Sequence, residues 1–383
     1  MKILFVVTTL GLGGVQEHVR LLSKYLKGKG NDIWVAYGAP EDRAKSFRSI
    51  GVNLVPMGLK KPINPYADVR AFFALLRLML RERFDVVHVH MTKAGILGRL
   101  AAKLAGVKVV IMTGHGWSGH LENYFNHIWA QRCFFLIEKV WGHWLTDGII
   151  LLTEEDLTAI KEKRMYPEKK LFMVPNGIDI AGLKRAATCE NRRSLGLDEN
   201  AFIIITVGRV CKVKAQWVFV KAAEKILRLM PEARFLLVGE GPDWMKIQQL
   251  IEECGIKDRF YMLGKRDDVP SLLLASDIFV LTSITEGMAM TLLEAMALGK
   301  PVVVTDIPGN RSLVRDGETG ILIPTGNPEA LAETLEHLAK TPDLRNRLGE
   351  NARKRVEELF DYVTMGERTL EVYERLLKAR NAL

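Results

Sequence analysis

The chain has 383 residues, of which 48% are apolar and 26% are charged, values typical of a globular protein that exclude a disordered or fibrous one. At about 150 residues per domain the length predicts two domains, and no apolar run reaches the roughly 18 uncharged residues of a membrane-spanning helix. The net charge of +9 arises in residues 1–175, which hold 25 Lys and Arg against 15 Asp and Glu, whereas residues 176–383 hold 29 against 30.

Strands and helices alternate along the first half of the chain. Residues 2–9 (KILFVVTT) predict a buried strand and not a signal peptide, because the stretch is short and no small-residue cleavage site follows it. A helix pattern at 15–30 ends at Gly30 and leads to a strand at 32–38. The pattern then predicts helices at 69–83, 96–106 and 121–145, and strands at 84–90, 108–115 and 146–153.

The same rhythm begins again after residues 173–180 (MVPNGIDI), where Pro175, Asn176 and Gly177 break the pattern. Strands are predicted at 201–208, 233–239, 259–264 and 277–282, helices near 215–230 and 243–254, and two final helices at 343–360 and 363–380. Met365, Val372, Tyr373 and Leu376 share one face of the last helix. Continuous apolar strands that alternate with helices form parallel sheets buried on both faces, so we expect an α/β protein with two doubly wound domains.

The first strand is followed by GLGG, with glycines at Gly11, Gly13 and Gly14, and then by a helix. Such a turn lets backbone N–H groups and the helix dipole face an anion. It is not a dinucleotide fingerprint, because Gln16 stands where the third glycine is needed. A tight strand-to-helix turn without a ligand explains these glycines equally well.

A second loop carries two cations. In GRVCKVK, Arg209 follows a strand and Lys214 comes five residues later, so both side chains can reach the carboxyl end of a central strand, where ligands collect in open α/β sheets. Arg binds phosphate oxygens with a planar fork and Lys acts as a point charge. Two solvated surface cations are the alternative.

Residues 285–306 (TEGMAMTLLEAMALGKPVVVTD) contain two carboxylates in an otherwise apolar run. Thr291 and Glu294 have capping-box spacing, and Gly299 and Pro301 can end a helix that begins near 291, which explains Glu294 without a ligand. That explanation does not cover Glu286, which precedes the helix. Cations and a helix end suit a diphosphate, and carboxylates suit ribose and hexose hydroxyls, so the combination predicts a nucleotide-sugar site.

No DxD-type metal site accompanies these motifs, and Asp267-Asp268 is better interpreted as the cap of the following helix. We therefore expect no metal and no cofactor, with protein cations in place of Mg²⁺ at the diphosphate.

Taken together, GRVCKVK, the spaced Glu286 and Glu294, and VPNGID resemble retaining GT-B glycosyltransferases of family 4. Residues 85–117 resemble the members that build bacterial polysaccharides and lipid-linked glycans. The resemblance covers nearly the whole chain. It implies two Rossmann-like domains that face a cleft: an acceptor-binding domain at 1–175, a nucleotide-sugar donor-binding domain at 176–360, and a helix at 361–383 that crosses back to the first domain.

The resemblance also implies a role for individual residues. Arg209 and Lys214 would bind the donor diphosphate, Glu286 the sugar hydroxyls, and Glu294 the ribose. His115 would lie beside the reacting sugar and belong to the catalytic set with Arg209, Lys214 and Glu286. The donor-facing backbone would lie at Gly13, Gly14, Gly287, Met288 and Ala289.

Three positions depart from the family pattern. Ala215 stands where the family usually has Gly after the lysine, Ser312 stands where a Glu is common, and Pro308 replaces the first of two glycines. These changes concern loops near the donor and not the whole site.

The histidines need separate interpretation. His88 and His90 alternate on one strand, and we expect His88 to be structural and His90, nearer the carboxyl end, to line the cleft. Glycines flank His115 and expose it. His120, His127 and His143 lie in an aromatic stretch and are expected to be surface or interface groups.

We expect a retaining enzyme that moves a hexosyl or N-acetylhexosaminyl unit from a UDP-type nucleotide sugar to a hydroxyl of a lipid-linked or growing glycan. The alternatives are a sugar-nucleotide epimerase or a phosphorylase on the same architecture, and a catalytically silent sugar-nucleotide-binding module. A phosphorylase needs a pyridoxal lysine and a longer chain, an epimerase lacks this form of the Glu pair, and the complete cation and carboxylate set argues against a silent module.

The basic first half has several explanations: a solvated face, a phosphorylated substrate, an anionic membrane surface or nucleic acid. No nucleic-acid-binding motif accompanies the charge, so we expect no nucleic-acid partner. The arginine-bearing helix at 68–83 and the aromatic stretch at 117–144 could lie at a lipid interface.

Scattered cysteines favour a reduced compartment. We expect a cytoplasmic protein that is peripheral on the inner face of the plasma membrane.

Overall fold

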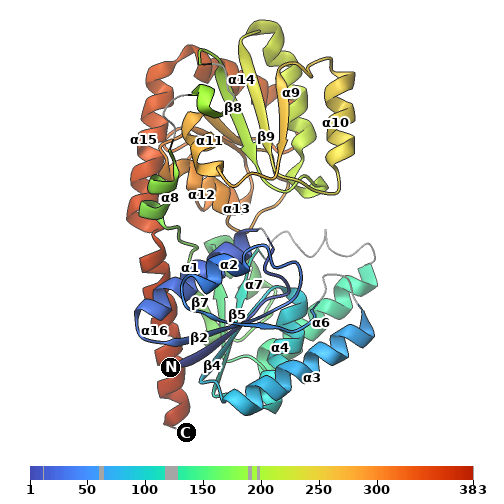
Figure 1. Cartoon of the computed structure of the whole chain (residues 1–383), viewed down its shortest axis with the longest axis vertical. Coiled ribbons are helices and arrows are strands. Elements are labelled where there is room, and N and C mark those ends of the chain that lie inside the picture. Colours follow the sequence, from blue (N-terminus) through green and yellow to red (C-terminus); the bar gives the residue numbers. More distant parts are fainter. Residues whose placement is uncertain (12, 60–63, 117–127, 189–191, 196–198, 383) are drawn as a thin grey trace. The chain divides into compact units, whose positions relative to one another are not determined.

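The computed structural model describes residues 1–11, 13–59, 64–116, 128–188, 192–195 and 199–382. The chain divides into two compact units (Figure 1). The first unit comprises Met1–Gly177 and Tyr362–Leu383, and the second comprises Ile178–Asp361. Within the described residues, none of the helices combines the length and the hydropathy that crossing a bilayer requires.

The first unit contains a sheet of seven parallel strands in the order β3-β2-β1-β4-β5-β6-β7. The strand order reverses between β1 and β4, which are neighbours in the sheet although they are far apart in the sequence. The strands are β1 (Lys2–Val6), β2 (Asp32–Tyr37), β3 (Asn53–Pro56), β4 (Val86–His90), β5 (Val109–Gly114), β6 (Gly148–Leu151) and β7 (Leu171–Met173).

Helices cover both faces of this sheet. Its helices are α1 (Gly14–Gly28), α2 (Ala44–Arg48), α3 (Pro65–Glu82), α4 (Thr92–Leu104), α6 (Ile128–Trp144), α7 (Glu154–Glu162), the short η1 (Glu168–Lys170) and α16 (Tyr362–Asn381). Leu4 and Val6 of β1 belong to the core cluster that α3, α4, α6 and α7 complete. The alternate residue Phe5 points to the other face and contacts the rings of His88 and His90. Successive side chains of β1 therefore pack on opposite faces of the sheet.

A buried ion pair ties α4 to α6 inside the first of these cores. Nη2 of Arg99 lies 2.5 Å from Oε1 of Glu138, and both side chains are fully buried. Tyr166 donates a hydrogen bond of 3.1 Å to the other carboxylate oxygen, and Nε of Arg99 donates to the carbonyl of Gly95. Burying a charge is costly unless it is paired and hydrogen-bonded, and this network meets both conditions.

The last helix belongs to the first unit. α16 packs on α1 and on β5, and Gly366 lies so close to Tyr25 that an added Cβ would stand 2.3 Å from its ring. Met365, Val372 and Tyr373 are buried, and Leu376 is half-buried, as the apolar face of the sequence predicts.

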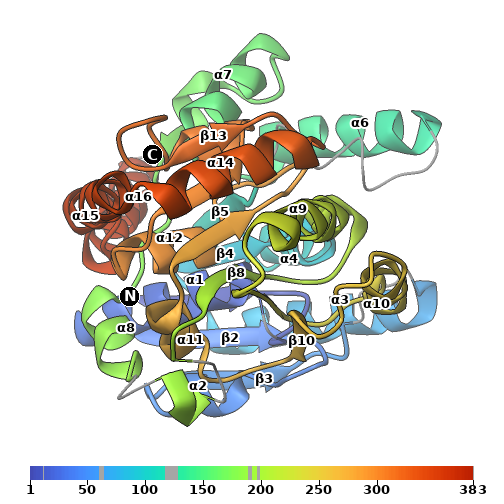
Figure 2. The same ribbon diagram turned by 90° about the horizontal axis from the view of Figure 1, so that it is seen from above.

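The second unit contains six parallel strands in the order β10-β9-β8-β11-β12-β13, and this order reverses between β8 and β11. Figure 2 shows the edge strands β10 and β13 on opposite sides of β8. The strands are β8 (Phe202–Val207), β9 (Ala233–Val238), β10 (Phe260–Gly264), β11 (Ile278–Leu281), β12 (Val302–Thr305) and β13 (Ile321–Ile323). One core lies between the sheet and α9, α10 and α14.

Its helices are α8 (Ile180–Ala186), η2 (Arg192–Leu195), η3 (Lys212–Lys214), α9 (Gln216–Leu229), α10 (Trp244–Glu253), α11 (Val269–Ala275), α12 (Met290–Ala297), α13 (Pro308–Arg311), α14 (Pro328–Lys340) and α15 (Pro342–Leu359). The predicted α/β class with two parallel sheets is confirmed. The sequence patterns missed the short edge strands β3 and β7, because edge strands are partly exposed and carry no continuous apolar run. The strands β12 and β13 and the helices α2, α7, α8, α13 and α14 were missed as well.

Candidate functional site

The loop after β8 carries the two predicted cations. Arg209 is exposed, and its backbone carbonyl accepts a hydrogen bond of 2.9 Å from the side chain of Gln216. Lys214 ends η3, and Ala215 follows with φ +47° and ψ 41°, in the left-handed region. A residue other than glycine costs about 1–2 kcal/mol there. The Ala that replaces the family glycine therefore strains the loop but keeps its conformation.

Lys214 and Glu286 form an ion pair with each other, and Ser283 donates a hydrogen bond of 2.5 Å to the same carboxylate oxygen. The sequence offered no structural explanation for Glu286, and this ion pair supplies one. The loops that carry the pair are themselves linked, because Thr282 donates to the carbonyl of Lys214 at 2.9 Å. The two side chains of this pair are only 20% and 12% exposed, and Lys214 belongs to the same loop as Arg209.

The predicted capping box at Thr291 and Glu294 is wrong. α12 begins two residues earlier than that pattern requires, with Ala289 instead of Thr291 as N-cap and no side chain bonded to its first turn. Thr291 instead donates to the carbonyl of Val207 at 3.3 Å, which ties α12 to β8. The unused N–H groups at the start of α12 are a favourable place for an anion. Glu294 lies half-buried on the same helix.

Gly287, Met288 and Ala289 lead into α12, and the side chains of Met288 and Ala289 are 7% exposed. Only the backbone of this segment can therefore meet a ligand. Behind it, a Cβ on Gly309 would stand 2.3 Å from the carbonyl oxygen of Gly287. The glycine that remains after Pro308 is thus required for close packing, whereas Pro308 only begins α13.

Ser312 donates to the carbonyl of Gly309 at 2.8 Å, so it stabilises the end of α13. Asp268 occupies the N-cap position of α11, but its carboxylate pairs with Arg266 and makes no capping hydrogen bond. The predicted position of the cap at Asp267-Asp268 is therefore correct, but the predicted capping by the side chain is wrong.

A cavity of about 580 Å³ adjoins the cationic loop in the second unit. Glu240, Gly241 and Trp244 line it from one side and residues 262–264 from the other. The N–H of Val210 donates to the carbonyl of Glu240 at 3.0 Å, so the loop that presents Arg209 is bonded to a residue that lines this cavity. The cavity joins an aromatic side chain with backbone polar groups.

In the first unit, Gly13 and Gly14 are exposed where α1 begins, and no side chain caps that helix end. Gln16, where a dinucleotide fingerprint would need glycine, turns back to donate to the carbonyl of Thr9 at 3.1 Å. The glycine turn therefore lies at the carboxyl end of β1, next to the reversal of strand order between β1 and β4.

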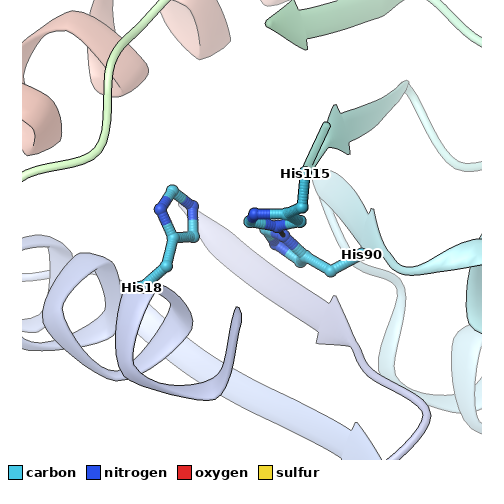
Figure 3. A group of neighbouring side chains, drawn as sticks. All are labelled: His18, His90 and His115. Carbon is cyan, nitrogen blue, oxygen red and sulfur yellow. Dashed lines mark hydrogen bonds between the residues drawn. The ribbon is translucent and has the colours of Figure 1, made fainter. Parts of the chain in front are cut away.

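Three histidines gather at this reversal: His18 from α1, His90 at the end of β4, and His115 directly after β5 (Figure 3). One ring nitrogen of each lies within 4.8 Å of the others. Nδ1 of His90 lies 3.0 Å from Nε2 of His115, and Nδ1 of His18 lies 2.8 Å from Oδ1 of Asn176. Among the described residues this is the group with the donor spacing of a metal site, so it is the place where an ion or a small polar ligand could be held.

Burial lowers the pKa of His18 to about 4, although the hydrogen bond that its Nδ1 donates to Oδ1 of Asn176 acts in the opposite direction. Burial also holds the pKa of His90 well below its usual range, and the neighbouring histidines lower it further. Both rings are therefore neutral at pH 7 and offer lone pairs, not positive charge.

His88 has the structural role that its strand position predicts. Its ring is fully buried, with Nδ1 2.6 Å from the hydroxyl of Tyr373 and Nε2 2.7 Å from Oγ1 of Thr113. This contact ties α16 to the sheet. His143 is exposed as expected, and His120 and His127 lie outside the described residues.

The structure thus brings Lys214 and Glu286 together in the second unit, and His90 and His115 together in the first. Sequence reasoning missed His18 and the role of Asn176. The sequence did contain an indication for His18, because this histidine lies on the apolar face of a helix that follows a glycine turn. Asn176 carried none, because its partner is 158 residues away.

Two protein-family models together match almost the whole chain. The family model Glycosyltransferase Family 4 matches residues 12–181, and the model Glycosyl transferases group 1 matches residues 188–355. The boundary between the two matches falls close to the boundary between the two structural units.

Two characterised proteins illustrate the similarity. The chain is 32% identical over 332 residues to the UDP-Gal:α-D-GlcNAc-diphosphoundecaprenol α-1,3-galactosyltransferase of Escherichia coli, which covers 82% of this chain and 81% of that protein. It is 29% identical over 363 residues to the N-acetyl-α-D-glucosaminyl L-malate synthase of Bacillus anthracis, with 93% and 91% covered.

Among solved structures, the chain is similar to HepE of Anabaena in complex with UDP and glucose. The TM-score is 0.84 at 22% identity, and the match covers 98% of this chain and 100% of that chain. Both consist of two Rossmann-like units, and the likeness establishes the GT-B fold.

The neutral histidines predict that the first unit loses stability in mild acid. The folded pKa of His18 lies below its unfolded value, so its neutral ring stabilises the fold above pH 6.5, and this contribution is lost as the pH falls from 6.5 towards 4. For His18 alone, the free energy of unfolding should drop by about 2 kcal/mol between pH 7.5 and 5. Hydrogen exchange of the β1 and β4 amides at each pH measures it.

The His18→Gln variant should show a pH dependence that is shallower by that amount. The exposed His143 supplies the control, and H143Q should follow the wild type. An H18Q slope as steep as that of the wild type would contradict the assigned burial effect.

Proposed function

The chain belongs to the family 4 glycosyltransferases, and we propose that it transfers a hexosyl or N-acetylhexosaminyl unit from a UDP-sugar to a hydroxyl of a lipid-linked or growing glycan, with retention of the anomeric configuration. The observation that carries the proposal is the grouping of Arg209, the Lys214–Glu286 pair and the uncapped start of α12 at one edge of the second sheet.

Each part of this group suits one part of a sugar nucleotide. Arg209 and Lys214 neutralise the diphosphate, and the N–H groups at the start of α12 add hydrogen bonds to its oxygens. Glu286 accepts hydrogen bonds from the transferred sugar, and Glu294 from the ribose. These donors are protein groups, so the chemistry proceeds without a bound metal or cofactor.

The ion pair of Lys214 and Glu286 positions both side chains before the donor arrives. Ser283 holds the carboxylate, and Thr282 holds the backbone of Lys214. Charges that are already oriented stabilise the developing negative charge of the leaving phosphate without reorganisation. Such preorganised electrostatic stabilisation often contributes more to catalysis than any other single effect.

The cavity beside Val210 provides a place for the nucleotide base. Trp244 offers a planar surface, and residues 262–264 offer backbone groups that can read the edge of a base.

The proposed retention relies on attack from the same face and not on a covalent intermediate with an enzyme nucleophile. Glu286 is paired with Lys214, which leaves it poorly suited to act as a nucleophile. The acceptor oxygen then attacks from the face that the phosphate leaves, the new bond forms to the anomeric carbon, and the departing phosphate oxygen takes the acceptor proton. The name of the E. coli relative joins a UDP-galactose donor to an α-1,3 product, which supports the same outcome.

The acceptor is proposed to reach the first unit from a membrane surface. Tyr66, Val69, Phe73 and Leu80 form an exposed stripe on α3, each between 54% and 80% exposed, and Arg70, Arg77 and Arg81 flank it. On α6, Leu136, Val140 and Trp144 are exposed at four-residue spacing. Apolar side chains beside arginines suit the headgroup region of an anionic bilayer, and the E. coli relative acts on a polyprenyl diphosphate.

The Arg209→Ala variant tests the donor site. Removal of one charge from the leaving group should lower kcat/KM for the donor by ~10²-fold or more. The variant should also lose the thermal stabilisation that UDP-sugars confer on the wild type in a screen of nucleotide sugars. Arg228, which is exposed on α9 and pairs with Glu224, supplies the control.

R228A should retain both properties. Turnover of R209A at the wild-type rate would overturn the assignment of the diphosphate site. Binding of UDP-sugars without turnover on a broad panel of acceptors would favour a silent binding module instead.

Sedimentation with vesicles tests the membrane surface. The wild type should bind vesicles of anionic phospholipid at low salt and release them as salt rises, because screening weakens the attraction of the arginines. Replacing Phe73 and Leu80 by Ser should weaken binding about tenfold through lost apolar burial. Leu229 and Met245 are similarly exposed in the second unit, and their Ser variants should bind like the wild type. Failure of the wild type to bind at low salt would contradict this part of the proposal.

A further inference from the structure

Two ring nitrogens in the histidine group of the first unit are buried without a partner among the described residues: Nε2 of His18 and Nε2 of His90. The side chains are 2% and 0% exposed. A buried polar atom without a hydrogen bond destabilises a fold, and such atoms are rare in native proteins. Two of them in rings whose centroids lie 5.4 Å apart point to a ligand that completes their hydrogen bonding.

The hydrogen bond of His18 to Asn176 fixes the state of its free nitrogen. Because the amide oxygen of Asn176 only accepts, Nδ1 of His18 carries the proton and Nε2 carries the lone pair. Since burial keeps the ring neutral, this lone pair is present at pH 7. His18 therefore offers one acceptor to the group.

In one of its two tautomers His90 offers the complementary donor. Its Nδ1 shares a hydrogen bond with Nε2 of His115. When His115 donates this bond, Nδ1 of His90 accepts it and the proton of His90 lies on Nε2. The site then presents one acceptor and one donor, with no net charge, on two adjacent rings.

A hydroxyl group matches this pair, and phosphate and metal ions match it less well. A neutral site lacks the positive charge that phosphate needs. Ligand nitrogens on a tetrahedral zinc ion with bonds of 2.0–2.1 Å stand about 3.4 Å apart, whereas nitrogens that share one oxygen through hydrogen bonds of about 2.8 Å stand about 4.6 Å apart. One ring nitrogen from each of the three histidines lies within 4.8 Å of the others, and this limit includes the spacing that a shared oxygen needs.

We infer that His18 and His90 bind one hydroxyl of the acceptor sugar. The hydroxyl donates to Nε2 of His18 and accepts from Nε2–H of His90, while Asn176 and His115 hold the two rings in the required tautomers. This assignment rests on the proposed transfer reaction, and it makes His18 a specificity-determining residue on the acceptor side.

Two substitutions of His18 separate its binding role from its structural role. In His18→Asn the side-chain amide can still donate to Asn176, but nothing replaces Nε2. In His18→Gln the longer side chain can place an acceptor near the position of Nε2, and the bond to Asn176 is lost. A merely structural His18 predicts that H18N is the milder change, whereas hydroxyl binding predicts that H18Q is. His143→Asn is the control on an exposed histidine.

The assay uses the full chain, a UDP-sugar that it accepts, and an alkyl-diphosphate-linked N-acetylglucosamine with its monodeoxy analogues as acceptor probes. H18N should raise the acceptor KM by about 10- to 100-fold, with the donor KM and the slow hydrolysis of donor unchanged. H18Q should stay within a few-fold of the wild type. One deoxy analogue should be poor for the wild type and no poorer for H18N. Stabilisation of the wild type by the acceptor probe in thermal unfolding, lost in H18N, reports the contact without turnover.

Four outcomes would overturn the inference. The first is an acceptor KM of H18N equal to that of the wild type, and the second is an equal rise of the donor KM, which would assign the site to the donor sugar. The third is a larger loss of acceptor affinity in H18Q than in H18N. The fourth is one equivalent of zinc in the purified protein. A wild type that turns over no nucleotide sugar would instead refute the proposed function. Thermal unfolding with the acceptor probe would still test whether His18 binds a hydroxyl.

Discussion

The constraint on which the rest of the structure depends is the reversal of strand order in each parallel sheet. All strands of such a sheet end at the same edge, and where the order reverses the two following loops diverge and leave room for a ligand. The reversal between β1 and β4 receives the glycine turn, His18 and His90. The reversal between β8 and β11 receives Arg209, Lys214 and Glu286. Both candidate sites are thus consequences of topology before any side chain is chosen.

The two sites differ in their electrostatics, and the difference fits a division of labour. In the second unit a charged pair, Lys214 with Glu286, lies beside an exposed arginine and an uncapped helix start, an arrangement suited to a charged diphosphate. In the first unit burial keeps the histidines neutral, an arrangement suited to hydroxyl groups. A transferase needs both, because its donor carries a charged leaving group and its acceptor reacts as a neutral alcohol.

Much of this could be predicted from sequence, because parallel strands are continuous apolar runs and the ligand loops follow them directly. The positions of Arg209, Lys214 and Glu286 at one sheet edge followed from that rule. The ion pair between Lys214 and Glu286 did not, since it joins residues 72 positions apart. The capping box failed because the preceding loop begins α12 at Met290, which places Thr291 inside the helix. His18 escaped notice because a histidine on an apolar helix face is usually only a core residue.

The central claim is that the enzyme retains the anomeric configuration and stabilises the leaving diphosphate with preorganised protein side chains. The anomeric configuration of the product tests this claim most directly. The chain would be incubated with a UDP-α-sugar and a diphosphate-linked N-acetylglucosamine acceptor, and the first-formed glycoside examined by proton NMR without added metal. The account predicts an α-linked product with release of UDP. A β-linked product, or transfer that requires an added divalent metal ion, would contradict it.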